Sequence, residues 1–154
     1  MMNRHYLTDG VIELRLNAVE RNDWLFPLVY FYDIYEYQGK TKVGKCDFRR
    51  QKNIENYYAG NIGYMILPPY RGRGYAYLAA CLLCKLASGL RVRSFYITCS
   101  PENTASYRTI VKLGAEYLER AIVPKEHYLH RQGEQVKDIF IMRLNGKNSE
   151  ELTG

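Results

Sequence analysis

The hydrophobic pattern of the chain changes at Pro68-Pro69, and this change most limits the folds that the sequence can adopt. Before the two prolines, β-branched and aromatic residues form runs of the kind found in strands. After them, residues 75–88 carry leucines at helical spacing. Proline cannot donate to a sheet ladder, so a strand must end at this point. We therefore predict an α/β (α+β) fold in which a strand-rich first half precedes alternating helices and strands.

Turn and capping residues set the expected limits of these elements. Gly89 is expected to end the first helix. Ser100 and Pro101 are expected to begin a second helix, which Gly114 closes. The turn QGKT predicts a hairpin between the second and third strands. The predicted strands cover residues 11–16, 28–37, 42–48, 57–67, 94–99, 117–123 and 139–144.

The length of 154 residues favours one domain, which we place at residues 1–145, followed by a polar C-terminal tail at 146–154. The net charge of +6 is compatible with an anionic ligand. The lysines and arginines are scattered, so we expect no nucleic acid partner. No window holds the roughly 20 apolar residues of a membrane span, and the N-terminus lacks the apolar core of a signal peptide. We therefore expect no membrane partner and a cytoplasmic location.

The four cysteines are interpreted as reduced thiols of the core. Cys81 and Cys84 form a C-x-x-C pair, a spacing that also occurs in zinc and redox sites. The pair lies inside an apolar helical run, and no second cysteine pair or histidine pair stands at ligand spacing. We therefore expect no metal. The other two thiols are Cys46 and Cys99.

The turn Arg71-Gly72-Arg73-Gly74 stands where a strand ends and a helix begins. The first amides of a helix have no partners within the helix, and the helix dipole is positive there, so an anion is the natural ligand. Glycines let the backbone approach phosphate oxygens, and arginines add positive charge. The turn is neither a P-loop nor a dinucleotide fingerprint. A plain structural connection between strand and helix is the alternative.

Around this turn the sequence resembles the GNAT superfamily of N-acetyltransferases. RGRGYA, residues 71–76, matches the Arg/Gln-x-x-Gly-x-Gly/Ala acetyl-CoA signature of that family. The stretches AGNIGYMILPPY and ITCSPENTASYRTIVKLGA match the flanking strand and the strand and helix that follow, so the similarity covers residues 57–115. It implies a mixed, splayed central sheet of six to seven strands flanked by helices.

The resemblance implies acetyl-CoA as co-substrate and an amine as acceptor. The expected reaction is direct attack by a primary amine of a small metabolite, or of a peptide or protein N-terminus, on the thioester in a ternary complex. The alternative is a non-catalytic CoA-binding sensor or interaction domain. The residues that would bind the cofactor by this resemblance are Met65, Ile66, Leu67, Arg71, Gly72, Arg73, Gly74, Tyr75, Ala76, Asn103 and Ser106.

Several of these positions have more than one interpretation. Asn103 could bind the pantetheine amide or cap its own helix. Gly63 predicts a bulge or a close approach in its strand. Many family members carry a tyrosine acid where this chain has Ile110, so Ser106 and Tyr107 are the candidate catalytic residues. No base is assigned, and the groups considered are Glu36, Asp47, Glu55, His127 and His130.

The connection over residues 17–27 is short for this family, which usually inserts one or two helices there. It leaves room for one short helix at most. We expect either an open acceptor groove, which suits a peptide amine, or a groove completed by a second subunit. Trp24 and Phe26 in this connection are assigned to either the core or such an interface.

Overall fold

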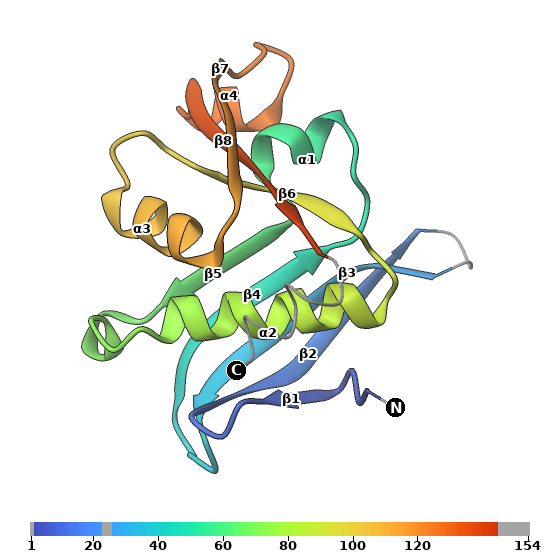
Figure 1. Cartoon of the computed structure of the whole chain (residues 1–154), viewed down its shortest axis with the longest axis vertical. Coiled ribbons are helices and arrows are strands. Elements are labelled where there is room, and N and C mark those ends of the chain that lie inside the picture. The colour runs from blue at the N-terminus through green and yellow to red at the C-terminus, as the bar shows by residue number, and fades with distance from the viewer. Residues whose placement is uncertain (1, 23–25, 145–154) are drawn as a thin grey trace.

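The computed structural model describes residues 2–22 and 26–144 of the chain. Strands and helices alternate after a strand-rich first half, as predicted (Figure 1). In chain order the elements are β1 Tyr6–Thr8, β2 Ile12–Asn22, β3 Phe26–Glu36, β4 Lys42–Arg49, α1 Ile54–Ala59, β5 Ile62–Ile66, a 3-10 turn Pro68–Tyr70, α2 Tyr75–Gly89, β6 Ser94–Cys99, α3 Thr104–Leu113, β7 Glu116–Ile122, α4 Tyr128–Arg131 and β8 Val136–Arg143.

The strands form two sheets that part between β5 and β6. One sheet has the order β1-β2-β3-β4-β5 and the other the order β6-β8-β7, with antiparallel pairing in both. Helix α2 lies across one face of the five-stranded sheet, and α3 lies beside it near the diverging strands (Figure 1). The predicted α/β fold with a splayed sheet is confirmed.

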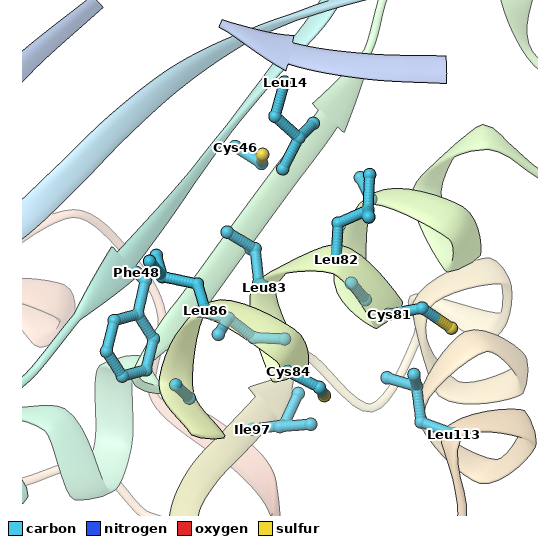
Figure 2. Close-up of a cluster of buried hydrophobic side chains, with 14 of the residues drawn as sticks. Leu14, Cys46, Phe48, Cys81, Leu82, Leu83, Cys84, Leu86, Ile97 and Leu113 are labelled. Atoms are coloured by element: carbon cyan, nitrogen blue, oxygen red, sulfur yellow. The ribbon is translucent and has the colours of Figure 1, made fainter. Parts of the chain in front are cut away.

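The core is built around one helix. Leu82, Leu83 and Leu86 of α2 are buried between the five-stranded sheet and the layer formed by β6 and α3 (Figure 2). Cys81 and Cys84 lie on the same helix, and all four cysteines are buried and free. Burial raises the pKa of these thiols, since it penalises the thiolate. The thiols therefore act as small apolar side chains of the core.

Asn61 joins the two sheets just before they separate. Its side chain is fully buried, and its Nδ2 donates to the carbonyl oxygens of Arg49 and Gln51, each at 2.7 Å. Its Oδ1 accepts from the Tyr96 amide at 2.8 Å, and its own amide donates to the Tyr96 carbonyl at 2.7 Å. One asparagine thus replaces a stretch of strand pairing, and β5 and β6 diverge beyond it.

The predicted strand over residues 57–67 was wrong in its first part. Residues Ile54–Ala59 form the helix α1, and only Ile62–Ile66 are a strand. Asn53 caps the helix by accepting from the Asn56 amide at 2.9 Å, and Gly60 ends it with a positive φ of 85°. A capping residue and a left-handed glycine outweigh the strand preference of the tyrosines between them.

The connection between the first two predicted strands holds no helix in its described part. Strand β2 continues to Asn22 and β3 begins at Phe26, so a long hairpin fills it, with register shifts at Leu16/Ala18 and Glu20/Arg21. Trp24 and the side chain of Phe26 lie outside the described residues, as does the predicted tail 146–154.

Helix α2 ends at Gly89 as predicted, and Arg91, with φ 63°, takes a left-handed conformation beyond it. One predicted helix limit and one missing strand need correction. Helix α3 begins at Thr104 with Asn103 as its cap, three residues after the expected start. Strand β1, Tyr6–Thr8, was not predicted, because three residues carry too little pattern.

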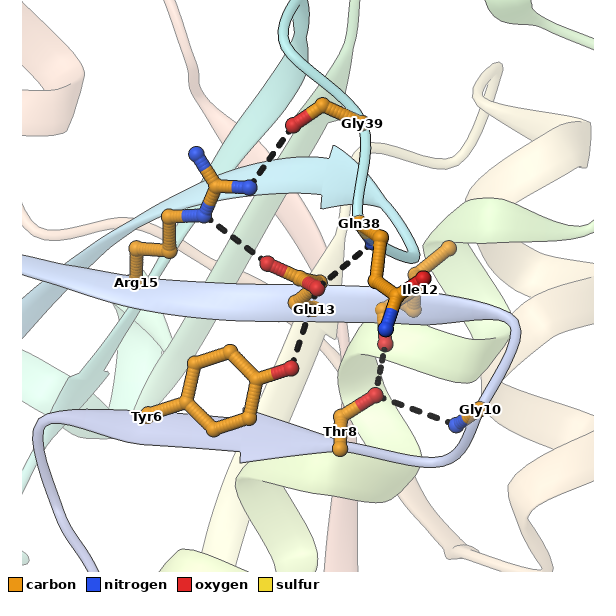
Figure 3. Close-up of polar contacts among 8 residues, drawn as sticks. All are labelled: Tyr6, Thr8, Gly10, Ile12, Glu13, Arg15, Gln38 and Gly39. Atoms are coloured by element: carbon orange, nitrogen blue, oxygen red, sulfur yellow. Dashed lines mark hydrogen bonds and ion pairs between the residues drawn. The ribbon is translucent and has the colours of Figure 1, made fainter.

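A buried carboxylate fixes one end of the five-stranded sheet (Figure 3). Glu13 is 3% exposed and accepts hydrogen bonds from the Gln38 amide at 2.7 Å, from Tyr6 Oη at 2.9 Å and from Arg15 Nε at 2.8 Å. Arg15 also donates to the Gly39 carbonyl at 2.7 Å. These bonds tie β1 and β2 to the turn that follows β3.

We expect Glu13→Gln to destabilise the protein at pH 7 by about 2 kcal/mol, because these donors lose their charged acceptor. The hydrogen bond from the Gln38 amide is the main cause that lowers the pKa of Glu13 in the folded state. The carboxylate therefore stabilises the fold above its unfolded pKa, near 4.5, and this contribution is lost as the pH falls through the folded pKa.

The difference in melting temperature between wild type and Glu13→Gln should accordingly shrink as the pH is lowered from 7 to below about 4. Thermal unfolding followed by circular dichroism over this range measures it. The control is Glu116→Gln, since Glu116 is paired at the surface with Arg143. A difference in melting temperature between wild type and Glu13→Gln that stays constant from pH 7 to pH 4 would show that the charge of Glu13 does not stabilise the fold.

Candidate functional site

The glycine turn between β5 and α2 presents unused amides to open space. Gly72 and Gly74 have φ of 84° and 77°, and a Cβ built on either would meet nothing within 4 Å. Gly74 is the N-cap of α2 and offers no side-chain cap. Among the described residues, no acceptor is recorded for the amides of residues 72–77. The turn is therefore a cradle of main-chain donors at the positive end of a helix, and it suits an anion.

The arginines of this turn are tied to the protein. Arg71 Nε donates to the Ile66 carbonyl at 2.8 Å, which links the turn to the end of β5. Arg73 Nη1 lies 3.3 Å from a carboxylate oxygen of Glu36, at the end of β3. The Tyr75 hydroxyl donates to the same carboxylate, and this bond raises the pKa of Tyr75. The arginines thus brace the cradle as well as adding positive charge to it.

A cavity of about 500 Å³ runs from this cradle along the splayed edge of β5 to the start of α3. It brings together most of the residues predicted to bind the cofactor. Of the predicted set, Leu67 and Arg73 are outside the lining residues, and so is Tyr107. The lining residues are Tyr64, Met65, Ile66, Tyr70, Arg71, Gly72, Gly74, Tyr75, Ala76, Tyr77, Asn103, Ala105, Ser106 and Thr109.

The main-chain groups of β5 divide between its two edges. The Leu67 amide donates to the Val43 carbonyl at 2.8 Å, and a Cβ on Gly44 would collide with the Met65 carbonyl oxygen. Residues 65 and 67 therefore direct these groups toward β4. Because main-chain groups alternate between the edges of a strand, those of Tyr64 and Ile66 face the cavity. The Ile66 carbonyl already accepts from Arg71 Nε, so the main-chain groups of Tyr64 and the Ile66 amide are those that an extended ligand would meet.

The predicted residues of α3 point in two directions. Asn103 and Ser106 line the cavity, and Asn103 Oδ1 caps the helix by accepting from the Ser106 amide at 3.1 Å. The side-chain NH₂ of Asn103 is therefore the group that can donate a hydrogen bond to a ligand. Tyr107 instead packs edge-on against Phe140 of β8, with ring centroids 5.5 Å apart. Ile110, at the position of the family tyrosine, is fully buried.

Tyr64 is the site residue that the sequence did not reveal. Its hydroxyl shares a hydrogen bond of 2.9 Å with Ser106 Oγ, which connects β5 to α3 across the opening between the sheets. Burial raises the pKa of Tyr64. Only its place in the alternation of β5, between Ile62 and Ile66, could have indicated that it faces α3.

The outer face of the sheet carries a second cavity of about 550 Å³, on which Asp47 lies. Asp47 is paired with Arg49 Nε at 2.8 Å, and burial raises the pKa of its carboxyl group. Its Oδ1 would stand 2.7 Å from a Cβ on Gly63. The predicted bulge at Gly63 is absent, because β4 and β5 pair without a register shift there. The predicted close approach at Gly63 is present, and the carboxylate of Asp47 is the group that approaches the glycine.

The other groups considered as bases have structural roles or lie elsewhere. His127 caps α4, where Nδ1 accepts from the Leu129 amide at 3.1 Å and Nε2 lies 2.9 Å from the Glu55 carbonyl oxygen. Both ring nitrogens of His127 are therefore engaged within the protein. Glu36 braces the cradle, and His130 belongs to α4. Of the five groups, only Asp47 lines the outer cavity.

A model of the acetyltransferase (GNAT) domain matches residues 7–116 of the sequence. The chain belongs to the GNAT acetyltransferase family. The match includes the glycine turn, β5 and α3, the elements that line the cavity. A search of curated protein sequences gives no match.

Solved structures share the fold of this GNAT chain. A GNAT acetyltransferase from Bacillus anthracis has a TM-score of 0.59 at 24% identity, over 73% of this chain and 65% of that one. The ribosomal-protein-S5-alanine acetyltransferase from Vibrio fischeri has a TM-score of 0.61 at 14% identity, over 77% and 63%. The microcin C7 self-immunity acetyltransferase MccE, in complex with acetyl-CoA and AMP, has a TM-score of 0.57 at 17% identity, over 76% and 62%.

The GNAT chain thus spans between 62% and 65% of the length of these structures. In the described ranges 2–22 and 26–144, none of its helices has the length and apolar character needed to cross a bilayer.

Proposed function

We propose that the protein transfers an acetyl group from acetyl-CoA to a primary amine. The observation that carries this proposal is the continuity of the 500 Å³ cavity, which joins the amide cradle at Gly72 and Gly74 to the free edge of β5 and to Asn103. A long ligand with a diphosphate at one end and amide groups along its length can bind the cradle amides with its diphosphate. Its amide groups can then bond to the edge of β5 and to Asn103. The shape and the chemistry of the cavity fit coenzyme A.

Each part of the cavity has a role in this proposal. The amides of residues 72–76 bind the diphosphate, and the main-chain groups of Tyr64 and the Ile66 amide bind the pantetheine arm as an added strand would. An edge amide that faces the thioester carbonyl would stabilise the charge that develops on its oxygen. The side-chain NH₂ of Asn103 is positioned to donate to an amide carbonyl of the arm.

The outer cavity is the proposed entry for the acceptor. It shares Gly63, Tyr64 and Arg49 with a smaller polar cavity of about 210 Å³ at the opening between the sheets. The hairpin of β2 and β3 leaves it broad, and Phe31 is 40% exposed on its surface. A broad cavity suits a peptide or protein N-terminus, and we propose that Asp47 faces the incoming amine.

The test has two measurements on the purified protein. CoA at about 100 times its Kd should stabilise the folded state by about 2.7 kcal/mol, seen as a higher melting temperature. Acetyl-CoA should then release free thiol in the presence of a suitable amine. The panel should hold polyamines, amino acids and peptides. The peptides should include some that begin with alanine, because the Vibrio fischeri structure is named a ribosomal-protein-S5-alanine acetyltransferase.

The same peptides with acetylated N-termini are the matched controls, and they should release no thiol. A higher melting temperature without thiol release from any acceptor would favour the non-catalytic CoA-binding domain instead. A melting temperature that does not respond to CoA would refute both functions.

A further inference from the structure

We propose that the hydroxyl group of Tyr64 is the proton donor to the departing thiol, an inference that rests on the proposed acetyl transfer. Tyr64 lies on β5 where the two sheets part, and it lines three cavities: the cofactor cavity, the outer cavity and the small polar cavity between the sheets. A residue at this junction adjoins both the proposed donor site and the proposed acceptor site.

Neither Ile110 nor Tyr107 of α3 is placed to donate the proton. Ile110 is fully buried and carries no exchangeable proton. The ring of Tyr107 packs against Phe140, and Tyr107 is outside the lining residues of the cofactor cavity. Of the acid candidates that the sequence suggested, only Ser106 reaches the cavity, and its hydroxyl is hydrogen-bonded to that of Tyr64 at 2.9 Å.

The surroundings of Tyr64 suit a proton donor. Burial is the main cause that raises its pKa above the usual value of 10.0, so the phenol is protonated at neutral pH. A thiol has a pKa near 8.5, so a thiolate that leaves from the thioester gains from a donor that is already in place. Ser106 holds the phenol through a single hydrogen bond, which fixes its direction toward α3.

The proton and the bonds balance in this step. The neutral amine nitrogen attacks the thioester carbonyl carbon, so a C–N bond forms and the C–S bond breaks. The sulfur takes the proton from Tyr64 Oη and leaves as the free thiol. The nitrogen, which now carries one proton too many, releases it to the solvent, and Tyr64 takes a proton back from the solvent. The products are an amide and a thiol, and the enzyme is unchanged.

The test compares Tyr64→Phe, Ser106→Ala and the control Tyr58→Phe, which removes a hydroxyl from α1. The donor is acetyl-CoA, and the acceptor is the panel amine or peptide with the fastest thiol release by wild type. We expect Tyr64→Phe to lower kcat about 100-fold. The Kd of CoA should stay at the wild-type value, and the melting temperature should fall by at most about 4 °C for the one hydrogen bond lost, which shows that the variant is folded. Ser106→Ala should cause a clearly smaller loss, and Tyr58→Phe none.

The comparison separates a proton donor from a structural tie. A hydrogen bond that only holds β5 to α3 is broken equally by Tyr64→Phe and by Ser106→Ala, so equal losses of kcat would overturn the proposal. An undiminished kcat for Tyr64→Phe would also overturn it and leave acetyl transfer intact. A wild-type protein that releases no thiol would instead refute the proposed function, and the inference with it.

Discussion

Replacing Gly74 with glutamate is expected to raise the Kd of CoA at least about 100-fold, equivalent to about 3 kcal/mol. Gly74 is the N-cap of α2, and its position points into the open space of the cradle. A glutamate there adds a negative charge beside the proposed diphosphate and fills space that the phosphate oxygens need. Its positive φ of 77° adds backbone strain of about 1–2 kcal/mol for a residue with a side chain.

The chain offers a matched control for the charge and the strain. Gly114 caps the C-terminal end of α3 with φ 86°, and a Cβ there also meets open space. Gly114→Glu should therefore lose stability to a similar extent and bind CoA as the wild type does. Isothermal titration calorimetry with CoA measures both variants. Equal affinities of Gly74→Glu and wild type would refute the placement of the diphosphate.

The second large effect is expected at Asn61. Asn61→Ala removes one acceptor and two donors from a fully buried site and leaves the Tyr96 amide and the carbonyls of Arg49 and Gln51 without these partners. Buried polar groups that lose their partners cost about 1–3 kcal/mol each, so we expect a total loss of about 3 kcal/mol. For a chain of this length that lowers the melting temperature by about 10 °C.

Two further variants test whether the side-chain donors of Asn61 account for this loss: Asn61→Asp, and Asn56→Ala as the control. The aspartate keeps the acceptor for the Tyr96 amide and loses both donors, so it should also destabilise the protein. Asn56 is half-buried and donates to the same Gln51 carbonyl at 2.6 Å, and Asn56→Ala should stay within about 0.5 kcal/mol of wild type. Chemical denaturation gives all three values. An Asn61→Ala variant as stable as wild type would show that the two sheets are joined mainly by other contacts.

Local patterns in the sequence were sufficient for most of the fold. The leucine spacing of α2, the glycine that ends α3 and the turn before β4 are local signals, and each predicted its element. The predicted strand over 57–67 failed because tyrosines suit either structure, and a cap at Asn53 decided the matter. The first strand, predicted over residues 11–16, continues to Asn22 in the structure, because its pairing with β3 extends far beyond the alternating pattern.

The residues of the candidate site also differ in whether local sequence could predict them. The cradle depends on a contiguous run of residues at one strand-to-helix junction, so the sequence indicated Gly72 and Gly74 directly. Tyr64 and Asn61 depend on contacts with residues 42 and 35 positions away, Ser106 and Tyr96, and no local pattern reports such pairs. Tyr107 was considered because it lies near the position of the family tyrosine, and in the structure its ring packs against Phe140 of β8.

The brace between Arg73 and Glu36 has a consequence for how the cradle would discriminate among anions. An arriving diphosphate must compete with a resident carboxylate for the same guanidinium, so whatever Coulombic attraction it gains from Arg73 is offset by what Glu36 gives up. Selectivity would then come from the direction of the main-chain N–H groups, which recognise shape, and the surplus of cationic residues would be a poor guide to affinity.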